Sequence, residues 1–103
     1  MIELNQTVPD FSLPTSGNQT MTLSNYLGKN IVLYFYPKDD TSGCTLEGQD
    51  FTRLHSEFTA HNTLIFGVSR ESVKSHDKFC AKYGFTFPLI SDETQFLCHL
   101  FAV

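Results

Sequence analysis

The chain has 103 residues and a formal net charge of −4, and 41% of its residues are hydrophobic, including ten phenylalanines. This length and composition predict one small globular domain over residues 1–103 rather than a linker or a disordered tail. The charge is modest, Lys and Arg do not cluster, and no apolar run reaches the roughly 18 residues of a membrane helix, which argues against nucleic acid and membrane as partners. The first residues also lack the basic start of a signal peptide, so we expect a cytoplasmic protein.

The first third of the chain is predicted to form short extended elements before a central strand. An N-terminal extended segment turns at Pro14–Gly17, a short strand lies near Met21–Leu23, and a helical turn ends at Gly28. Residues Ile31–Tyr36 are all apolar, β-branched or aromatic, as is typical of a strand covered on both faces. Pro37 is expected to end this strand.

A helix is predicted from Cys44 to about His61. Six residues fall on one face of this helix, which we expect to pack on the sheet: Cys44, Gly48, Phe51, Leu54, His55 and Phe58. The thiol of Cys44 should therefore be shielded, yet reachable from the preceding loop.

A second strand and helix follow the first pair. Thr63–Ser69 reads as another buried strand, and a helix is predicted from about Ser72 to Tyr83, with Gly84 as its C-terminal cap. One stripe of this helix should pack inward, and it consists of Val73, His76, Phe79, Cys80 and Tyr83.

The last part of the chain is predicted to add one short strand and one helix. Phe87–Ser91 reads as extended, and Asp92–Phe101 reads as a helix that the Asp92 side chain can cap. Strands that alternate with helices imply a parallel α/β layer with right-handed crossovers.

Cys44 has the strongest chemical signal among the three cysteines. At the start of a helix, unpaired N–H groups and the helix dipole favour the thiolate, which is the reactive form. A small buried core residue is the alternative interpretation, since free cysteine is often buried. Three widely separated cysteines favour redox use over structural disulfides. His99 beside Cys98 supplies too few ligands for zinc, which needs about four, so no metal is predicted.

The sequence of Tyr36–Gly48, YPKDDTSGCTLEG, resembles the active-site loop of the peroxiredoxins. The resemblance is closest to the subfamily called bacterioferritin comigratory protein or peroxiredoxin Q. Further stretches resemble motifs of that family and occur in the same order along the chain: Val8–Leu13, Gly67–Ser69, Ser75–Phe79 and Phe87–Asp92. Two features depart from the pattern, since Ser42 stands where the subfamily usually has proline, and family members continue well beyond Val103.

This resemblance implies an α/β fold of the thioredoxin-like peroxiredoxin type. The central sheet would be flanked by helices, and the C-terminal hairpin and last helix of the family would be missing from this chain. Full-length family members are expected to be monomers, whereas association is expected of a truncated chain, because an unfinished sheet exposes strand edges and apolar faces.

The resemblance also implies an activity. A thiol-dependent peroxidase would reduce hydrogen peroxide and organic hydroperoxides through a sulfenic acid on Cys44, the peroxidatic cysteine, without a bound cofactor. Thr41 would donate a hydrogen bond at the site, and Pro37 would fix the loop and limit water at the thiol. Glu47 matches a position that helps to organise the active-site charges, although a solvated glutamate is the more common interpretation.

Recycling of the sulfenic acid would use a second cysteine and thioredoxin or a similar dithiol protein. Gln49 occupies the position of the nearer resolving cysteine of the subfamily, so Cys80, at the spacing of the farther one, is the resolving candidate. A buried packing cysteine is the alternative for Cys80. A disulfide between Cys44 and Cys80 would require local unwinding, because bonded cysteines need Cα atoms within about 7 Å. Cys98 reads as a core residue.

A second function remains open from the sequence. Family members place an arginine over the thiolate from their C-terminal part, and neither Arg53 nor Arg70 matches that position. The alternative is therefore a truncated thioredoxin-like domain without turnover, which senses oxidation or binds a partner. A disulfide oxidoreductase of the thioredoxin type is disfavoured, because Cys44 has no cysteine three residues away.

Overall fold

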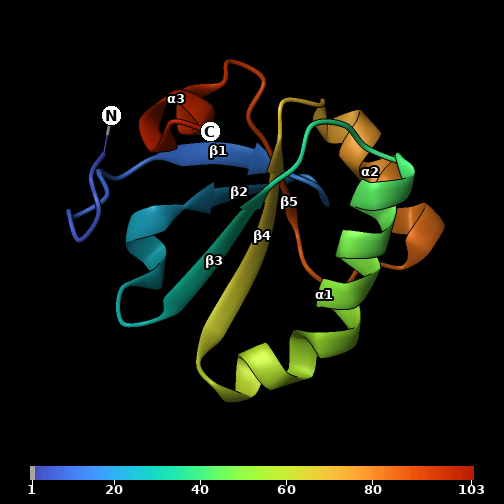
Figure 1. The fold of residues 1–103 in the computed structure, drawn as a ribbon, viewed down its shortest axis with the longest axis horizontal. Helices are drawn as coiled ribbons and strands as arrows, with labels where there is room; N and C mark the ends of the chain where they lie inside the picture. Colours follow the sequence, from blue (N-terminus) through green and yellow to red (C-terminus); the bar gives the residue numbers. More distant parts are fainter. Residues whose placement is uncertain (1) are drawn as a thin grey trace.

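The computed structural model describes residues 2–103, and a five-stranded sheet organises it (Figure 1). The strand order is β2-β1-β5-β4-β3. The strands are β1 Ser12–Thr15, β2 Gln19–Thr22, β3 Asn30–Phe35, β4 Thr63–Ser69 and β5 Leu89–Ser91. Strand β4 pairs in parallel with both β3 and β5, as expected of a chain that alternates strands and helices.

The sheet is mixed rather than wholly parallel, which corrects the prediction of a parallel layer. Strand β1 runs antiparallel to β2 and to β5. The reason is the tight connection between β1 and β2, in which Gly17 and Asn18 have left-handed φ values of 75° and 55°. Two strands joined so closely can pair only as an antiparallel hairpin.

Helices cover both faces of the sheet. Helices α1, Ser42–Ala60, and α2, Val73–Tyr83, lie on one side, and α3, Phe96–Phe101, lies on the other (Figure 1). The core is accordingly split into two clusters. One contains Tyr34, Tyr36, Cys44, Ile65, Phe79, Phe87 and Leu89, and the other contains Phe11, Met21, Phe66, Val68, Ile90 and Leu97.

Helix α2 forms as its sequence predicts. Ser72 is the N-cap, and its hydroxyl accepts a hydrogen bond from the N–H of Ser75 at 3.1 Å. Gly84 ends the helix with a left-handed φ of 66°, and its N–H donates to the carbonyl of Cys80. Gly84 is suited to this position because other residues rarely adopt a left-handed cap.

Other boundaries differ from the predictions. Helix α1 begins at Ser42, two residues early, because extended Thr41 precedes it as the N-cap. The predicted strand at Met21–Leu23 starts earlier, and Leu23 instead opens a short 3-10 helix, Leu23–Tyr26. Helix α3 begins only at Phe96, because a turn intervenes after β5.

Asp92 caps α3 from a distance rather than as its first residue. Its carboxylate accepts hydrogen bonds from the N–H groups of Leu97, at 3.1 Å, and Cys98, at 3.2 Å. Gln95, with a φ of 61°, is the residue at the N-cap position. Asp92 therefore caps the helix as predicted, but a turn lies between Asp92 and the first helical residue, Phe96.

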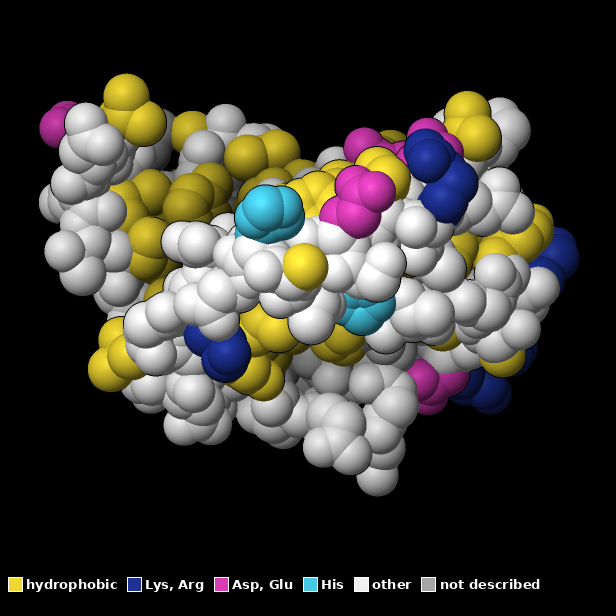
Figure 2. Space-filling view, turned by 90° about the horizontal axis from the view of Figure 1, so that it is seen from below, with side chains coloured by type: hydrophobic (Ala, Val, Ile, Leu, Met, Phe, Trp, Pro, Cys, Tyr) yellow, Lys and Arg dark blue, Asp and Glu magenta, His cyan; other side chains and the backbone are white. Residues whose placement is uncertain are grey.

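Strand β3 lies at the edge of the sheet and is flanked by two open apolar grooves. One groove is lined by side chains that include Val32, Leu54 and Phe58, and the other by side chains that include Ile31, Leu33, Phe35 and Phe101. Figure 2 shows hydrophobic side chains gathered in a recess of the surface seen from below. Within residues 2–103, no helix is long and apolar enough to cross a membrane.

Candidate active site

Cys44 lies in the first turn of α1 and is only 9% exposed. The first hydrogen bond within the helix runs from the N–H of Thr45 to the carbonyl of Thr41, at 2.8 Å. The N–H groups of Ser42, Gly43 and Cys44 precede it and have no carbonyl one turn back. These groups and the helix dipole form an electropositive environment for negative charge near the Cys44 sulfur.

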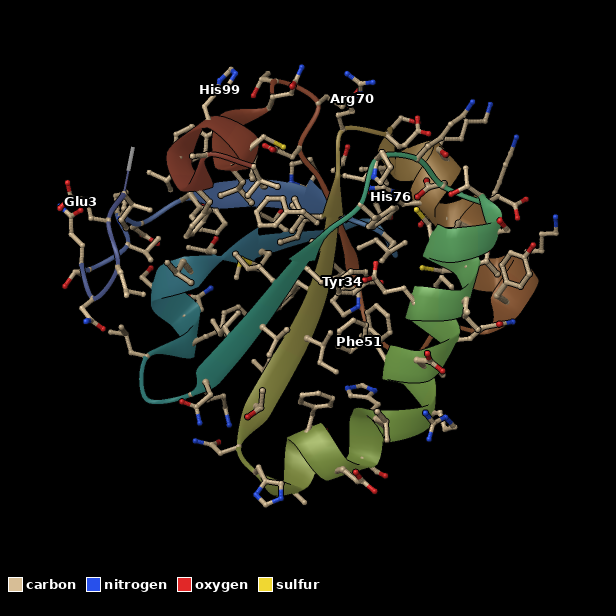
Figure 3. All side chains as sticks on the ribbon, in the orientation of Figure 1. Glu3, Tyr34, Phe51, Arg70, His76 and His99 are labelled. Atoms are coloured by element: carbon tan, nitrogen blue, oxygen red, sulfur yellow. The ribbon has the colours of Figure 1, made fainter. Side chains whose placement is uncertain are left out.

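Aromatic side chains shield the inner side of this site. Cys44 belongs to the same buried cluster as Tyr34, whose ring stacks on Phe51 of α1 with centroids 4.5 Å apart. Figure 3 shows Tyr34 and Phe51 facing each other between the sheet and α1. The hydroxyl of Tyr34 lies across β4, where a Cβ on Gly67 would lie 2.8 Å from the Tyr34 oxygen. Glycine at this position therefore permits the close approach of the phenol.

Tyr34 remains a neutral phenol because its surroundings oppose ionisation. Burial raises the pKa of Tyr34, and negative charge on Glu47, Cys80 and Cys44 raises this pKa further. The phenol is therefore a hydrogen-bond donor, and it belongs to the cluster that contains Cys44 and against which Cys80 packs. The sequence identified Tyr34 only as a strand residue.

The loop between β3 and α1 is held by a buried polar cluster around Asp39. The Asp39 carboxylate accepts hydrogen bonds from the hydroxyls of Tyr36 and Ser75 and contacts Nδ1 of His76, each at 2.7 Å. The other ring nitrogen of His76 lies 3.0 Å from the carbonyl oxygen of Ile90. Both ring nitrogens lie within hydrogen-bonding distance of oxygen atoms, which fixes the orientation of the ring.

This cluster keeps the Asp39 carboxyl ionised. Burial raises the pKa of Asp39, but the hydrogen bonds from His76, Tyr36 and Ser75 outweigh burial and hold the pKa below its usual range. Burial and the bond to Asp39 in turn raise the pKa of Tyr36. Asp39 thus joins the loop to β3 and α2 through charge-assisted hydrogen bonds.

The next loop residue, Asp40, binds the other end of α2. Its carboxylate accepts a hydrogen bond from Lys82 Nζ at 2.7 Å and another from the Tyr83 hydroxyl. These bonds hold the pKa of Asp40 below its usual range. Asp40 has a left-handed φ of 59°, which is uncommon for a residue other than glycine.

The other predicted site residues lie in or next to the loop before α1, and the structure does not bring all of them to the Cys44 thiol. Thr41 is exposed, and its hydroxyl donates to the carbonyl of Lys38 at 3.2 Å. Pro37 is exposed and lines a pocket of about 280 Å³ with Arg70 and Cys98. Glu47 lies one turn further along α1, and burial raises the pKa of its carboxyl.

The two remaining cysteines differ in their surroundings. Cys80 is half-buried against the cluster that contains Cys44. Burial raises the pKa of the Cys80 thiol, and this effect outweighs the influence of Ser16, which lowers the pKa. Cys98 is half-exposed and lines the pocket beside Arg70. The prediction of Cys98 as a core residue is wrong, because its neighbour Leu97 takes the buried position of this short helix.

Neither arginine lies in a described contact with Cys44. Arg53 pairs with Asp50 at 3.6 Å on the exposed side of α1, and Arg70 lines the pocket beside Cys98. Across residues 2–103, no group of three or more His, Cys, Asp or Glu side chains is arranged to hold a metal ion.

Comparison with known proteins identifies the family. The AhpC/TSA family model matches residues 4–103. The chain belongs to the AhpC/TSA family. Within this family it is a peroxiredoxin of the bacterioferritin comigratory protein or peroxiredoxin Q type, as the loop sequence predicted.

Two curated peroxiredoxins and one solved structure illustrate the similarity. "Peroxiredoxin Bcp" of Xanthomonas campestris is 52% identical over all of this chain, which spans 64% of that protein. "Peroxiredoxin Bcp" of Bacillus subtilis is 44% identical over 99% of the chain, which spans 65% of that protein. A structure of Xanthomonas campestris peroxiredoxin Q superposes with a TM-score of 0.88 at 54% identity, covering 90% of this chain and 59% of that one. The predicted thioredoxin-like peroxiredoxin fold is confirmed.

Sequence reasoning missed four polar residues around the site of this peroxiredoxin: Tyr34, Asp39, Asp40 and His76. The signal was present in part, because two aspartates precede Thr41 and His76 lies on the inward stripe of α2. A histidine on a buried helix face requires a partner, and the nearby loop offers carboxylates. Which carboxylate it meets depends on the tertiary fold.

Proposed function

We propose that the protein is a thiol peroxidase that reduces hydrogen peroxide and organic hydroperoxides with the thiolate of Cys44. The observation that carries the proposal is the position of Cys44, which is buried in the first turn of α1 beside N–H groups without a partner in the helix. Curated relatives named peroxiredoxin support the same class of reaction.

In the proposed reaction the Cys44 thiolate attacks one oxygen of the peroxide. A sulfur–oxygen bond forms, the O–O bond breaks, and the departing oxygen takes a proton and leaves as water or an alcohol. Donors must stabilise the negative charge that develops on that oxygen. The N–H groups of the first turn and the neutral phenol of Tyr34 are the donors we propose, together with Thr41 if its hydroxyl turns away from Lys38.

We expect residues 1–103 to act as one domain and to reduce peroxide slowly. Arg53 and Arg70 have other neighbours, so the donors above act without a guanidinium over the thiolate. Loss of one donor to a developing oxyanion typically reduces a rate by about 10²–10³. Glu47 would contribute indirectly, through its charge near Tyr34.

The sulfenic acid on Cys44 would be resolved by Cys80. Attack of the Cys80 thiolate on the Cys44 sulfur forms the disulfide and releases the hydroxyl group as water once it is protonated. Thioredoxin or a similar dithiol protein would then reduce the disulfide. The burial of both thiols against one cluster supports this pairing, and both are free cysteines in the structure.

A second candidate is a domain that becomes oxidised once and then binds a partner. The exposed edge of β3 and its apolar grooves favour this candidate, because such an edge can pair with another chain. Sustained consumption of peroxide in the presence of a dithiol reductant separates the two, since a sensor stops after one equivalent.

The proposal is tested by stopped-flow measurement of peroxide decay. Cys44→Ser should abolish consumption, because it removes the attacking sulfur. Cys98→Ser should leave the rate within about twofold, since Cys98 lies outside the cluster that contains Cys44. Equal loss of activity in both variants would remove the case for Cys44 as the attacking thiol.

A further inference from the structure

Two consecutive aspartates of the loop before α1 bind opposite ends of one helix. Asp39 contacts Ser75 and His76 in the first turn of α2, and Asp40 contacts Lys82 and Tyr83 in its last turn. Figure 3 shows His76 close to the loop that joins β3 to α1. The loop that delivers Cys44 and the helix that carries Cys80 are therefore joined at two points, which lie on either side of Cys80 in the sequence.

The two attachments differ in their exposure to water. The inner attachment is buried, because the His76 side chain is 0% exposed and that of Asp39 is 5% exposed. The outer attachment lies at the surface, where the Lys82 side chain is 58% exposed and that of Asp40 is 42% exposed. An exposed ion pair opens at low cost, whereas breaking buried hydrogen bonds leaves polar groups without partners and is costly.

The outer attachment acts on the turn of α2 that contains Cys80. The N–H groups of Gly84 and Phe85 both donate to the carbonyl of Cys80, so this turn ends the helix. Asp40 holds the same turn from outside through Lys82 and Tyr83. The contacts also hold Asp40 in its left-handed conformation, which is intrinsically unfavourable for this residue.

We propose that the contact of Asp40 with Lys82 and Tyr83 is a latch that sets the rate of disulfide formation between Cys44 and Cys80. This inference rests on the proposed function of these two cysteines. While the latch is closed, Cys80 stays half-buried against the cluster that contains Cys44. When it opens, the last turn of α2 can unwind and bring the Cys80 sulfur to the oxidised Cys44, while the Asp39 cluster keeps the first turn attached.

The covalent step itself needs no additional oxidant. Peroxide oxidises Cys44 to the sulfenic acid, the Cys80 thiolate attacks the Cys44 sulfur, and the S–S bond forms as the S–O bond breaks. The hydroxyl group leaves with a proton as water. The latch changes only how often the two sulfur atoms meet.

Single-turnover oxidation of the full 103-residue chain tests the latch. One equivalent of hydrogen peroxide is mixed with the reduced protein, the reaction is quenched with an alkylating reagent, and mass spectrometry follows sulfenic acid and disulfide with time. Asp40→Asn and Lys82→Met should form the disulfide about three- to fivefold faster than the unmodified chain, and Tyr83→Phe by a smaller factor. Asparagine retains the tolerance of aspartate for a left-handed φ.

Matched measurements separate the latch from general loosening of the helix. Lys78→Met removes an exposed lysine one turn earlier on α2. Within residues 2–103 this lysine forms no ion pair, so the substitution should leave the rate of disulfide formation unchanged. High salt should accelerate disulfide formation in the unmodified chain and have little effect in Lys82→Met. The rate of Cys44 oxidation should be the same in Lys82→Met, Tyr83→Phe and Lys78→Met as in the unmodified chain.

Two outcomes would overturn the proposal in different ways. If Cys44 is oxidised normally but all variants form the disulfide at the same rate, the latch is wrong and the proposed function stands. If peroxide leaves Cys44 unoxidised, or if no Cys44–Cys80 disulfide forms, the proposed chemistry fails and the latch fails with it.

Discussion

Cys44 and Cys80 have different surroundings, which suit different steps of the proposed cycle. Cys44 lies beside free N–H groups at a helix start, which favour attack on peroxide. Burial raises the pKa of Cys80 despite the opposing influence of Ser16, so this thiol stays protonated while it is buried. Cys80 should therefore become nucleophilic only after it reaches solvent, once Cys44 has been oxidised.

The residue-level prediction concerns the product of oxidation. Under stoichiometric peroxide, peptide mapping should recover an intramolecular disulfide between Cys44 and Cys80. Cys80→Ser should instead leave a sulfenic acid on Cys44 or an intermolecular dimer, because no other cysteine lies in the cluster that surrounds Cys44. Cys98→Ser is the matched control and should not change the linkage. Recovery of a Cys44–Cys98 disulfide alone would refute the assignment of Cys80.

The sequence indicated the cysteine that we propose as the attacking thiol, but not the polar groups around it. Cys44 was predicted from local features, namely the end of a strand, a loop and the start of a helix. Asp39 and His76 are 37 residues apart, and their contact exists only because the fold brings the loop after β3 next to the start of α2. The dependence on tertiary structure explains why a local pattern could not identify the pair.

At the scale of elements, the same distinction holds between local and non-local features. The N-cap Ser72 and the C-cap Gly84 of α2 were predictable, because each depends on its own side chain or φ angle. The antiparallel pairing of β1 with β5, in contrast, depends on a contact between distant segments. The sequence pattern therefore predicted the types of most elements better than their pairing.

The element-level prediction concerns the attachment of the loop to α2 in acid. The pKa of Asp39 is lowered in the folded protein, so the stability that its carboxylate contributes is present above the ordinary aspartate pKa and is lost as pH falls through the lowered value. Asp39→Asn should reduce the free energy of unfolding by about 1–3 kcal/mol at neutral pH. The difference between variant and unmodified chain should be constant from about pH 6 to about pH 5 and should shrink as pH falls below about 4.

Urea unfolding at several pH values measures this difference. Asp77→Asn is the control, because Asp77 is an exposed aspartate of α2 whose carboxylate accepts a hydrogen bond from the N–H of Gly17. Its effect at neutral pH should be smaller, because the Asp77 carboxylate is exposed. A difference between Asp39→Asn and the unmodified chain that stays constant below about pH 4 would contradict the charged state assigned to Asp39.

At the scale of the whole molecule, the sheet has one edge that is suited to further pairing. Strand β3 has β4 on one side only, and apolar grooves run along both of its faces. Edge strands of natural proteins are usually protected by charge, by proline or by a covering segment. The chain spans 64% of the Xanthomonas peroxiredoxin it resembles, and its open edge makes self-association the expected behaviour of residues 1–103.

Sedimentation velocity over a wide range of concentrations tests this expectation. The average mass of the 103-residue chain should rise with concentration, because pairing at β3 removes strand edge and apolar surface from water. Val32→Lys places a charge in one groove beside β3 and should reduce association. Leu4→Lys makes a similar change at a side chain that is 92% exposed and lines neither groove, so it should leave association unchanged. A chain that stays monomeric throughout, or equal association of both variants, would show that β3 is not the interface.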